Sequence, residues 1–238
     1  MKLDILAFGA HPDDVELSCS GLLLVEKSRG QKIGIVDLTE GEMGSRGDAQ
    51  TRYKESELAT SILGADVRIN LQMPDCFFEN NQDNKLKVIR AMRTYRPDVV
   101  LCNAPSDRHP DHGRGAQLVT ESCFLSGLIK IETSDDQGPQ EPWRPAHVFH
   151  YIQDRVLEPD FIVDISVHID KKLESIKAYK TQFHNPDVDG PETYISKPEF
   201  LDLVLQANKL LGKRIGCNYG EGYISTKKIG LHSLSDII

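Results

Sequence analysis

The chain has 238 residues, of which 39% are hydrophobic and 27% are charged, as is ordinary for one soluble domain with a substantial core. Its formal net charge of −8 argues against a general binder of nucleic acids or anionic membranes, and no stretch approaches the roughly 18 consecutive apolar residues of a membrane span. The five cysteines are scattered without a CxxC spacing, and the first residues do not resemble a signal peptide, so we expect reduced thiols and a cytoplasmic protein.

Expected strands and helices take turns along the chain. The strands are expected at 3–10, 32–39, 66–71, 98–103, 146–152 and 160–166. The helices are expected at 15–29, 51–65, 83–95, 113–129, 167–183 and 198–213, and 132–146 is expected to be a loop. This alternation, with β-branched residues in the strands, predicts an α/β fold: a single three-layer, Rossmann-like domain over residues 1–238 with a mainly parallel sheet.

The first expected strand ends on a polar cluster, in the stretch AFGAHPDDVELSCSG. His11 is followed by Asp13 and Asp14, and neighbouring carboxylates repel each other. That repulsion suggests that a cation lies between them. The alternative is ordinary, because an aspartate at this position often caps the helix that follows.

A second polar cluster follows the fourth expected strand, where APSDRHPDHGRG contains His109, Asp111 and His112. In a Rossmann-like order the first and fourth strands are neighbours at the switch point, where the strand order reverses. Ligands bind there, outside the carboxyl ends of the strands. Both clusters would then share one crevice. Imidazole and carboxylate groups suit Zn²⁺, with Fe²⁺ or Mn²⁺ also possible, and three such ligands leave positions open for water and substrate. HPDH alone is a short string, so it is the co-occurrence that favours a catalytic metal site.

The paired strings AHPDDVE and RHPDHGRG resemble the signature of the LmbE-like, or PIG-L-type, zinc-dependent N-deacetylases. The resemblance covers most of the chain, because TEGEMGSRG, TRYKESELATSILGA and LQMPDCFF are similar to successive segments of that family. It therefore implies an LmbE-like fold. The C-terminal strings PETYIS and RIGCNYGEGY resemble the branch that deacetylates N-acetylglucosaminyl-malate in bacillithiol biosynthesis.

The family pattern implies roles for residues of both clusters. His11, Asp14 and His112 would hold the metal ion. Asp13 would be the general base on the metal-bound water that attacks the acetyl carbonyl. The cation would then offset the repulsion between the two aspartates.

The remaining residues would stabilise the oxyanion, protonate the leaving amine, orient an imidazole or bind the substrate. His109 would stabilise the oxyanion or protonate the leaving amine, and Asp111 would orient an imidazole, most simply that of His109, or cap a helix. Arg52 and Asp75 match family positions that bind sugar hydroxyls; the ordinary alternatives are a surface ion pair and a turn residue. Arg108 precedes the metal motif and would meet a substrate carboxylate or remain a solvated charge.

The sequence therefore predicts a metal-dependent hydrolase that removes acetate from an N-acetylglucosamine conjugate, with N-acetylglucosaminyl-malate as the expected substrate. Two alternatives stay open: a deacetylase of N-acetylglucosamine or chito-oligosaccharides, and a non-catalytic Rossmann-like protein that binds a sugar or nucleotide. The missing motif argues against the binding-protein alternative, because the chain has no GxGxxG after its first expected strand. The family resemblance also implies a homo-oligomer. Tyr194 lies in a segment that could border the pocket, but an ordinary packing role is expected for it.

Overall fold

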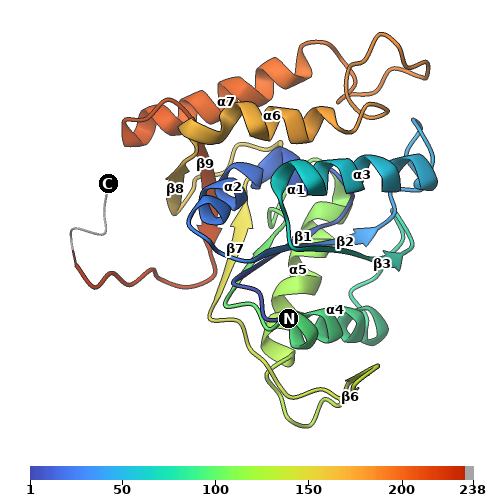
Figure 1. Ribbon diagram of the computed structural model, residues 1–238, viewed down its shortest axis with the longest axis vertical. Helices are drawn as coiled ribbons and strands as arrows, with labels where there is room; N and C mark the ends of the chain where they lie inside the picture. Colours follow the sequence, from blue (N-terminus) through green and yellow to red (C-terminus); the bar gives the residue numbers. More distant parts are fainter. Residues whose placement is uncertain (234–238) are drawn as a thin grey trace.

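The computed structural model describes residues 1–233, so residues 234–238 of the expected domain lie outside the described residues. Within the described part, one central sheet is built from β1 (Ile5–Gly9), β2 (Ile33–Thr39), β3 (Val67–Met73), β4 (Val99–Cys102), β7 (His147–Tyr151), β8 (Phe161–Asp164) and β9 (Gly220–Ser225). The strand order is β3-β2-β1-β4-β7-β9-β8 (Figure 1).

The sheet is mainly parallel, as expected. Strands β3, β2, β1, β4 and β7 run parallel, and β1 pairs directly with β4, with Ile5 opposite Val99. Strand β9 is antiparallel to both β7 and β8 and was not expected from the sequence. Its glycines disfavour a strand prediction. Gly220 is needed there, because a Cβ would lie 2.6 Å from a methyl group of Ile162.

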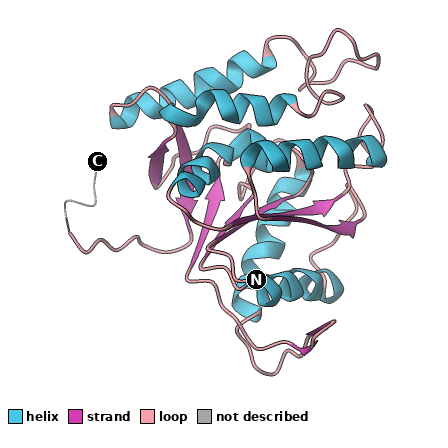
Figure 2. Ribbon diagram, in the orientation of Figure 1, coloured by secondary structure: helices cyan, strands magenta, loops and turns pink. Residues whose placement is uncertain are grey.

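Helices cover both faces of the sheet (Figures 1 and 2). Their bounds are α1 (Asp14–Ser18), α2 (Ser20–Ser28), α3 (Ala49–Leu63), α4 (Gln82–Tyr95), α5 (Pro110–Leu125), α6 (Ile169–Lys177) and α7 (Phe200–Ile215). Helices α4 and α5 lie on one face, and α1 to α3 lie on the other. Helix α6 packs over α1 to α3, and α7 packs against β8 and β9. None of the helices in the described part is long and apolar enough to cross a bilayer.

Several element boundaries differ from those expected. The helix expected at 15–29 is divided at Cys19, whose backbone leaves the helical region with φ −139°. The helix expected from residue 113 begins at Pro110, so Asp111 and His112 lie in its first turn rather than in a loop. Proline fits this position because its missing N–H would have no partner there. The loop expected at 132–146 contains a short hairpin of β5 (Ser134–Asp135) and β6 (Gly138–Pro139).

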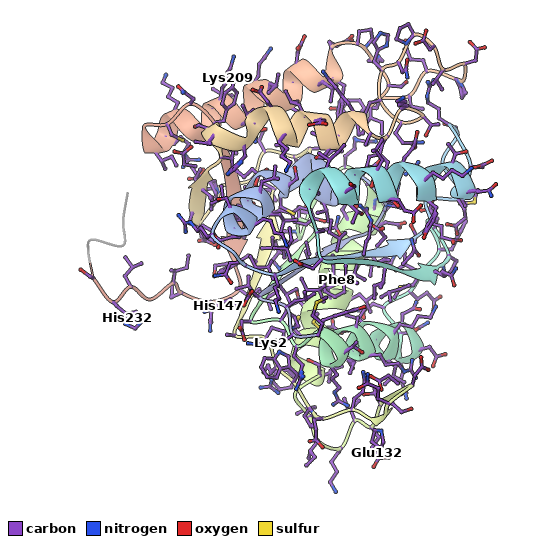
Figure 3. The ribbon with its side chains drawn as sticks, in the orientation of Figure 1. Lys2, Phe8, Glu132, His147, Lys209 and His232 are labelled. Atoms are coloured by element: carbon purple, nitrogen blue, oxygen red, sulfur yellow. The ribbon has the colours of Figure 1, made fainter. Side chains whose placement is uncertain are left out.

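The apolar core lies on both sides of the sheet because side chains alternate along each strand. From β1, Leu6 and Phe8 join the cluster that packs against α4 and α5. Ile5 and Ala7 join the cluster on the side of α1 and α2. Figure 3 shows Phe8 in the interior of the molecule, whereas Lys209 is exposed on α7. The buried strand β1 thus holds its carboxyl end, where His11 follows, in a fixed place.

A network of charged side chains anchors α1 behind that strand end. Arg68 on β3 contacts Asp37 through Nε at 2.7 Å and Nη2 at 2.8 Å, and Glu16 through Nη1 at 2.6 Å. The Tyr179 hydroxyl donates to Glu16 at 3.1 Å. Because Glu16 lies on the same short helix as Asp14, these contacts fix the direction in which Asp14 projects.

Candidate metal and catalytic site

The two polar clusters predicted from the sequence lie together at the carboxyl ends of β1 and β4. The ring centres of His11 and His109 are 4.6 Å apart, and those of His109 and His112 are 5.3 Å apart. Residues of both clusters line one cavity of about 360 Å³, together with the loop before α3 and one side of α7. The prediction of one shared crevice is confirmed.

His112 is held by a carboxylate on each side. Its Nδ1 lies 2.5 Å from Asp107 Oδ2, and its Nε2 lies 3.1 Å from Asp14 Oδ1. A second carboxylate on the outer nitrogen is typical of metal-ligating histidines, because it fixes the tautomer and leaves the other nitrogen to the ion. Sequence reasoning missed Asp107; its signal was its position two residues before His109.

His11 has the same arrangement with different partners. Its Nε2 lies 3.1 Å from Asp75 Oδ1 and 3.4 Å from Asp111 Oδ2, and its Nδ1 lies 3.6 Å from Asp14 Oδ2. Asp111 therefore turns its carboxylate toward His11, not toward His109 as expected; only its backbone N–H reaches His109 Nδ1, at 3.3 Å. The buried Asp75, expected to bind sugar hydroxyls, has its other oxygen on the backbone N–H of Met43 at 3.0 Å.

The donor set around Asp14 fits a divalent ion. Ligand atoms about 2.0–2.2 Å from a tetrahedral ion lie roughly 3.3–3.6 Å apart, which is close to the separations between Asp14 and the two imidazoles. Nitrogens of His11, His109 and His112 also lie within 4.8 Å of one another. Distance alone therefore allows His109 as a ligand as well, but its Nδ1 is occupied by the N–H of Asp111.

The charges of the site favour a cation at the same place. Burial opposes ionisation of Asp14, but the facing imidazoles outweigh it and hold the pKa of Asp14 well below its usual range. Burial likewise opposes charging of His112, yet Asp14 and Asp107 raise the pKa of His112 to about 9. Positive charge between these groups is stabilised, as a bound cation requires.

Asp13 lines the same cavity but faces Arg52. Its backbone has φ 122°, a strained conformation for a residue with a Cβ, and such strain is concentrated at functional sites. Its carboxylate is buried, 3.6 Å from Arg52 Nη1. Burial raises the pKa of Asp13 to about 7, with Asp14 adding to the rise and Arg52 opposing it. The two neighbouring carboxylates thus have different surroundings.

Arg52 is buried rather than on the surface. Its Nη1 donates to the carbonyl of Pro12 at 3.1 Å, and it lies under the loop that contains Gly41. Gly41 has φ 68°, and a Cβ there would lie 2.8 Å from Arg52 Nη1. The glycine-rich loop, which alone would suggest a mobile segment, is therefore closely packed over this arginine. Arg52 lines the cavity, so its expected contact with substrate stays a prediction.

Arg108, Asp154 and Tyr194 form a cluster at the edge of the cavity, which we call the rim cluster. Arg108 Nε lies 3.6 Å from Asp154 Oδ2, and its guanidinium lies 4.5 Å from the centre of the Tyr194 ring. The Tyr194 hydroxyl donates to Asp154 at 2.7 Å. Tyr194 therefore lines the cavity in addition to packing edge-on against Phe200, where only an ordinary packing role was expected.

Comparisons with known proteins identify a matching family model and several similar chains. A family model described as GlcNAc-PI de-N-acetylase matches residues 6–123, which include both clusters. A diacetylchitobiose deacetylase of Thermococcus kodakarensis is 26% identical over 96% of this chain and 85% of that protein. The uncharacterized deacetylase YaiS of Escherichia coli is 36% identical over 54% of this chain and 73% of that protein. The crystal structure of the conserved protein TT1542 from Thermus thermophilus has a TM-score of 0.87 and 34% identity, covering 98% of both chains.

Proposed function

This chain belongs to the PIG-L family of de-N-acetylases, and we propose that it hydrolyses the acetamide of an N-acetylglucosamine conjugate with a divalent metal ion. His11, Asp14 and His112 would hold the ion, with Zn²⁺ as the proposed metal and Fe²⁺ or Mn²⁺ as alternatives. The observation that carries the proposal is the buried Asp14 carboxylate between two imidazoles, each with a carboxylate on its other nitrogen.

A divalent ion held by these residues would polarise the acetyl carbonyl and would lower the pKa of water at the site. The chain's own residues supply the proton transfers. Asp13 would take the proton of the attacking water, because its buried carboxylate lines the cavity and faces Arg52 instead of the imidazoles that would hold the ion. Arg52 would keep that carboxylate in place. When the amide C–N bond breaks, the amine needs a proton, which Asp13 or His109 would return.

His109 is half-buried beside the other two imidazoles and caps α5. From there it would donate a hydrogen bond to the oxyanion or a proton to the leaving amine. Asp111 would act on His11, whose Nε2 faces its carboxylate, rather than on His109.

For the substrate we propose N-acetylglucosaminyl-malate. Two observations support it: the rim cluster places an arginine at the cavity edge, and the segments that resemble the malate branch line the cavity through Tyr194, Glu221 and Gly222. Arginine suits a carboxylate because its planar fork can pair both oxygens. Carboxylates outnumber arginines in the lining, so attraction of an anion would be local to the rim.

Diacetylchitobiose is the second candidate. The 26% identical relative that carries this name matches 96% of the chain. In addition, Asp154 already faces Arg108, which reduces the positive charge available to an anionic substrate. A neutral second sugar would not be repelled by the negatively charged carboxylates of the cavity lining.

Paired kinetics separate the two substrates. We expect a much higher kcat/KM for N-acetylglucosaminyl-malate than for diacetylchitobiose or free N-acetylglucosamine. Arg108→Ala should reduce that preference roughly 10-fold, the low end for a charge-assisted hydrogen bond, because Arg108 is half-exposed. The exposed Arg155, whose side chain bonds to Ser106, provides a matched control, since Arg155→Ala should leave the preference unchanged.

Each outcome of this experiment bears on a different part of the proposal. Equal or higher wild-type efficiency on diacetylchitobiose rejects the malate conjugate in favour of the oligosaccharide. A wild-type preference for the malate conjugate that survives Arg108→Ala keeps the substrate and rejects the role of Arg108. Failure to release amine from any of these compounds would contradict the deacetylase proposal itself.

A further inference from the structure

Two neutral amide side chains donate hydrogen bonds to the carboxylate of Asp14. Asn103 Nδ2 donates to Asp14 Oδ2 at 2.9 Å, and Gln153 Nε2 donates to Asp14 Oδ1 at 3.1 Å. The backbone N–H of His11 adds a third hydrogen bond, to Oδ2 at 3.0 Å. Both oxygens are therefore fixed by the chain itself, in addition to their contacts with the imidazoles.

The orientation of each amide is fixed as well. The Oδ1 atom of the fully buried Asn103 accepts the backbone N–H of Ala10 at 2.9 Å. Gln153 Oε1 accepts from Asn103 Nδ2 at 3.1 Å and from the backbone N–H of Ala104 at 3.2 Å. Because both amide oxygens receive N–H donors, each NH₂ group must face Asp14.

The fold places the two amides there. Asn103 directly follows β4, and Gln153 follows β7, the parallel neighbour of β4 in which His150 lies opposite Cys102. His150 Nδ1 donates to the carbonyl of Asn103 at 2.7 Å, which ties the two strand ends together. Burial lowers the pKa of His150, so its imidazole is neutral in this contact.

We propose that Asn103 and Gln153 are positioning residues, an amide pair that orients Asp14 and sets the affinity of the chain for its divalent ion. The inference rests on the metal site of the proposed function. Amides suit the task because they donate hydrogen bonds without charge, leaving the negative charge of Asp14 to the ion. A lysine or arginine would compete with it. Because the carboxylate is already held in one rotamer, its side chain loses less conformational entropy when the metal ion binds.

Gln153→Met tests the pair most directly, since methionine keeps the shape and removes the donor. Gln153 is only partly buried, so the variant is expected to fold. Its melting temperature in excess chelator, compared with that of the wild type, checks this expectation. The dissociation constant for Zn²⁺, measured by competition with a chelating dye, should rise about 10- to 100-fold, as is typical when a partner of a metal ligand is removed. Asn103→Leu should raise it by at least as much.

The matched control is Gln182→Met. Gln182 lines the same cavity but donates to the carbonyl of Arg46 at 2.7 Å, not to Asp14, so its loss should leave the dissociation constant unchanged. A Zn²⁺ affinity of Gln153→Met within twofold of wild type, or an equal loss in Gln182→Met, overturns the inference. Wild-type protein that binds no divalent ion overturns the proposed function instead, so the two failures are distinguishable.

Discussion

Asp13→Asn is expected to retain a bound divalent ion and to lose about 10²–10⁴-fold in kcat, the usual contribution of a general base. The structure explains why the two effects separate. Asp13 faces Arg52 at 3.6 Å, whereas Asp14 faces both His11 and His112. Asparagine is nearly isosteric but accepts no proton from water.

Metal content and kcat are measured on the same preparations of Asp13→Asn. Asp48→Asn controls for the loss of one negative charge, because Asp48 is an exposed cap of α3. It should keep both metal and turnover. If Asp13→Asn empties the site while Asp14→Ala leaves it full, the roles of the two aspartates are the reverse of those proposed.

Asp14→Ala should weaken metal binding by more than about 100-fold, since even the partners of metal ligands contribute 10- to 100-fold. The carboxylate removed is the group that both imidazoles face. Turnover should fall with the metal content. In wild type, a chelator should abolish turnover and Zn²⁺ should restore it.

Elemental analysis of purified chains checks this second expectation. We predict about one divalent ion per wild-type chain, consistent with one three-ligand open site, and almost none in Asp14→Ala. Active wild-type protein free of metal would remove the basis for the assignment of His11, Asp14 and His112.

The convergence of the two clusters could be predicted because it follows from topology. A parallel sheet in which the first and fourth strands are neighbours brings His11 and His109 to one edge, whatever the details of the loops. The strands themselves were recognisable from their buried apolar runs. Strand β9 was not, because its glycines serve a close approach to neighbouring elements that only the folded chain contains.

The direction of individual carboxylates could not be predicted from spacing. Asp75 and Asp111 reach His11 because Cys76 adopts φ 63° and its N–H donates to Asp111 Oδ2 at 2.9 Å. Nothing in the residue type of Cys76 indicates that conformation, which is uncommon outside glycine. The expected partner of Asp111 was therefore wrong, although its place beside the site was right.

The supporting residues were missed for a related reason. Asn103 and Gln153 belong to neither motif, and both contact Asp14 from other segments of the chain. Asp107 lies within the second polar string and contacts His112, five residues further along. For Asn103 and Gln153 the only signal in the sequence is position: Asn103 ends one predicted strand, and Gln153 directly follows another. Polar residues at such positions are worth examining in any parallel sheet.

Release of a free amine from an N-acetylglucosamine conjugate tests the central claim most directly. Purified, metal-loaded protein is incubated with N-acetylglucosaminyl-malate and with diacetylchitobiose, and acetate and primary amine are both quantified, with and without chelator. The account predicts equal amounts of acetate and amine from at least one of the two, with formation of both stopped by the chelator and restored by Zn²⁺. Binding of the sugars without any release of acetate or amine would contradict it and would favour a non-catalytic binding protein.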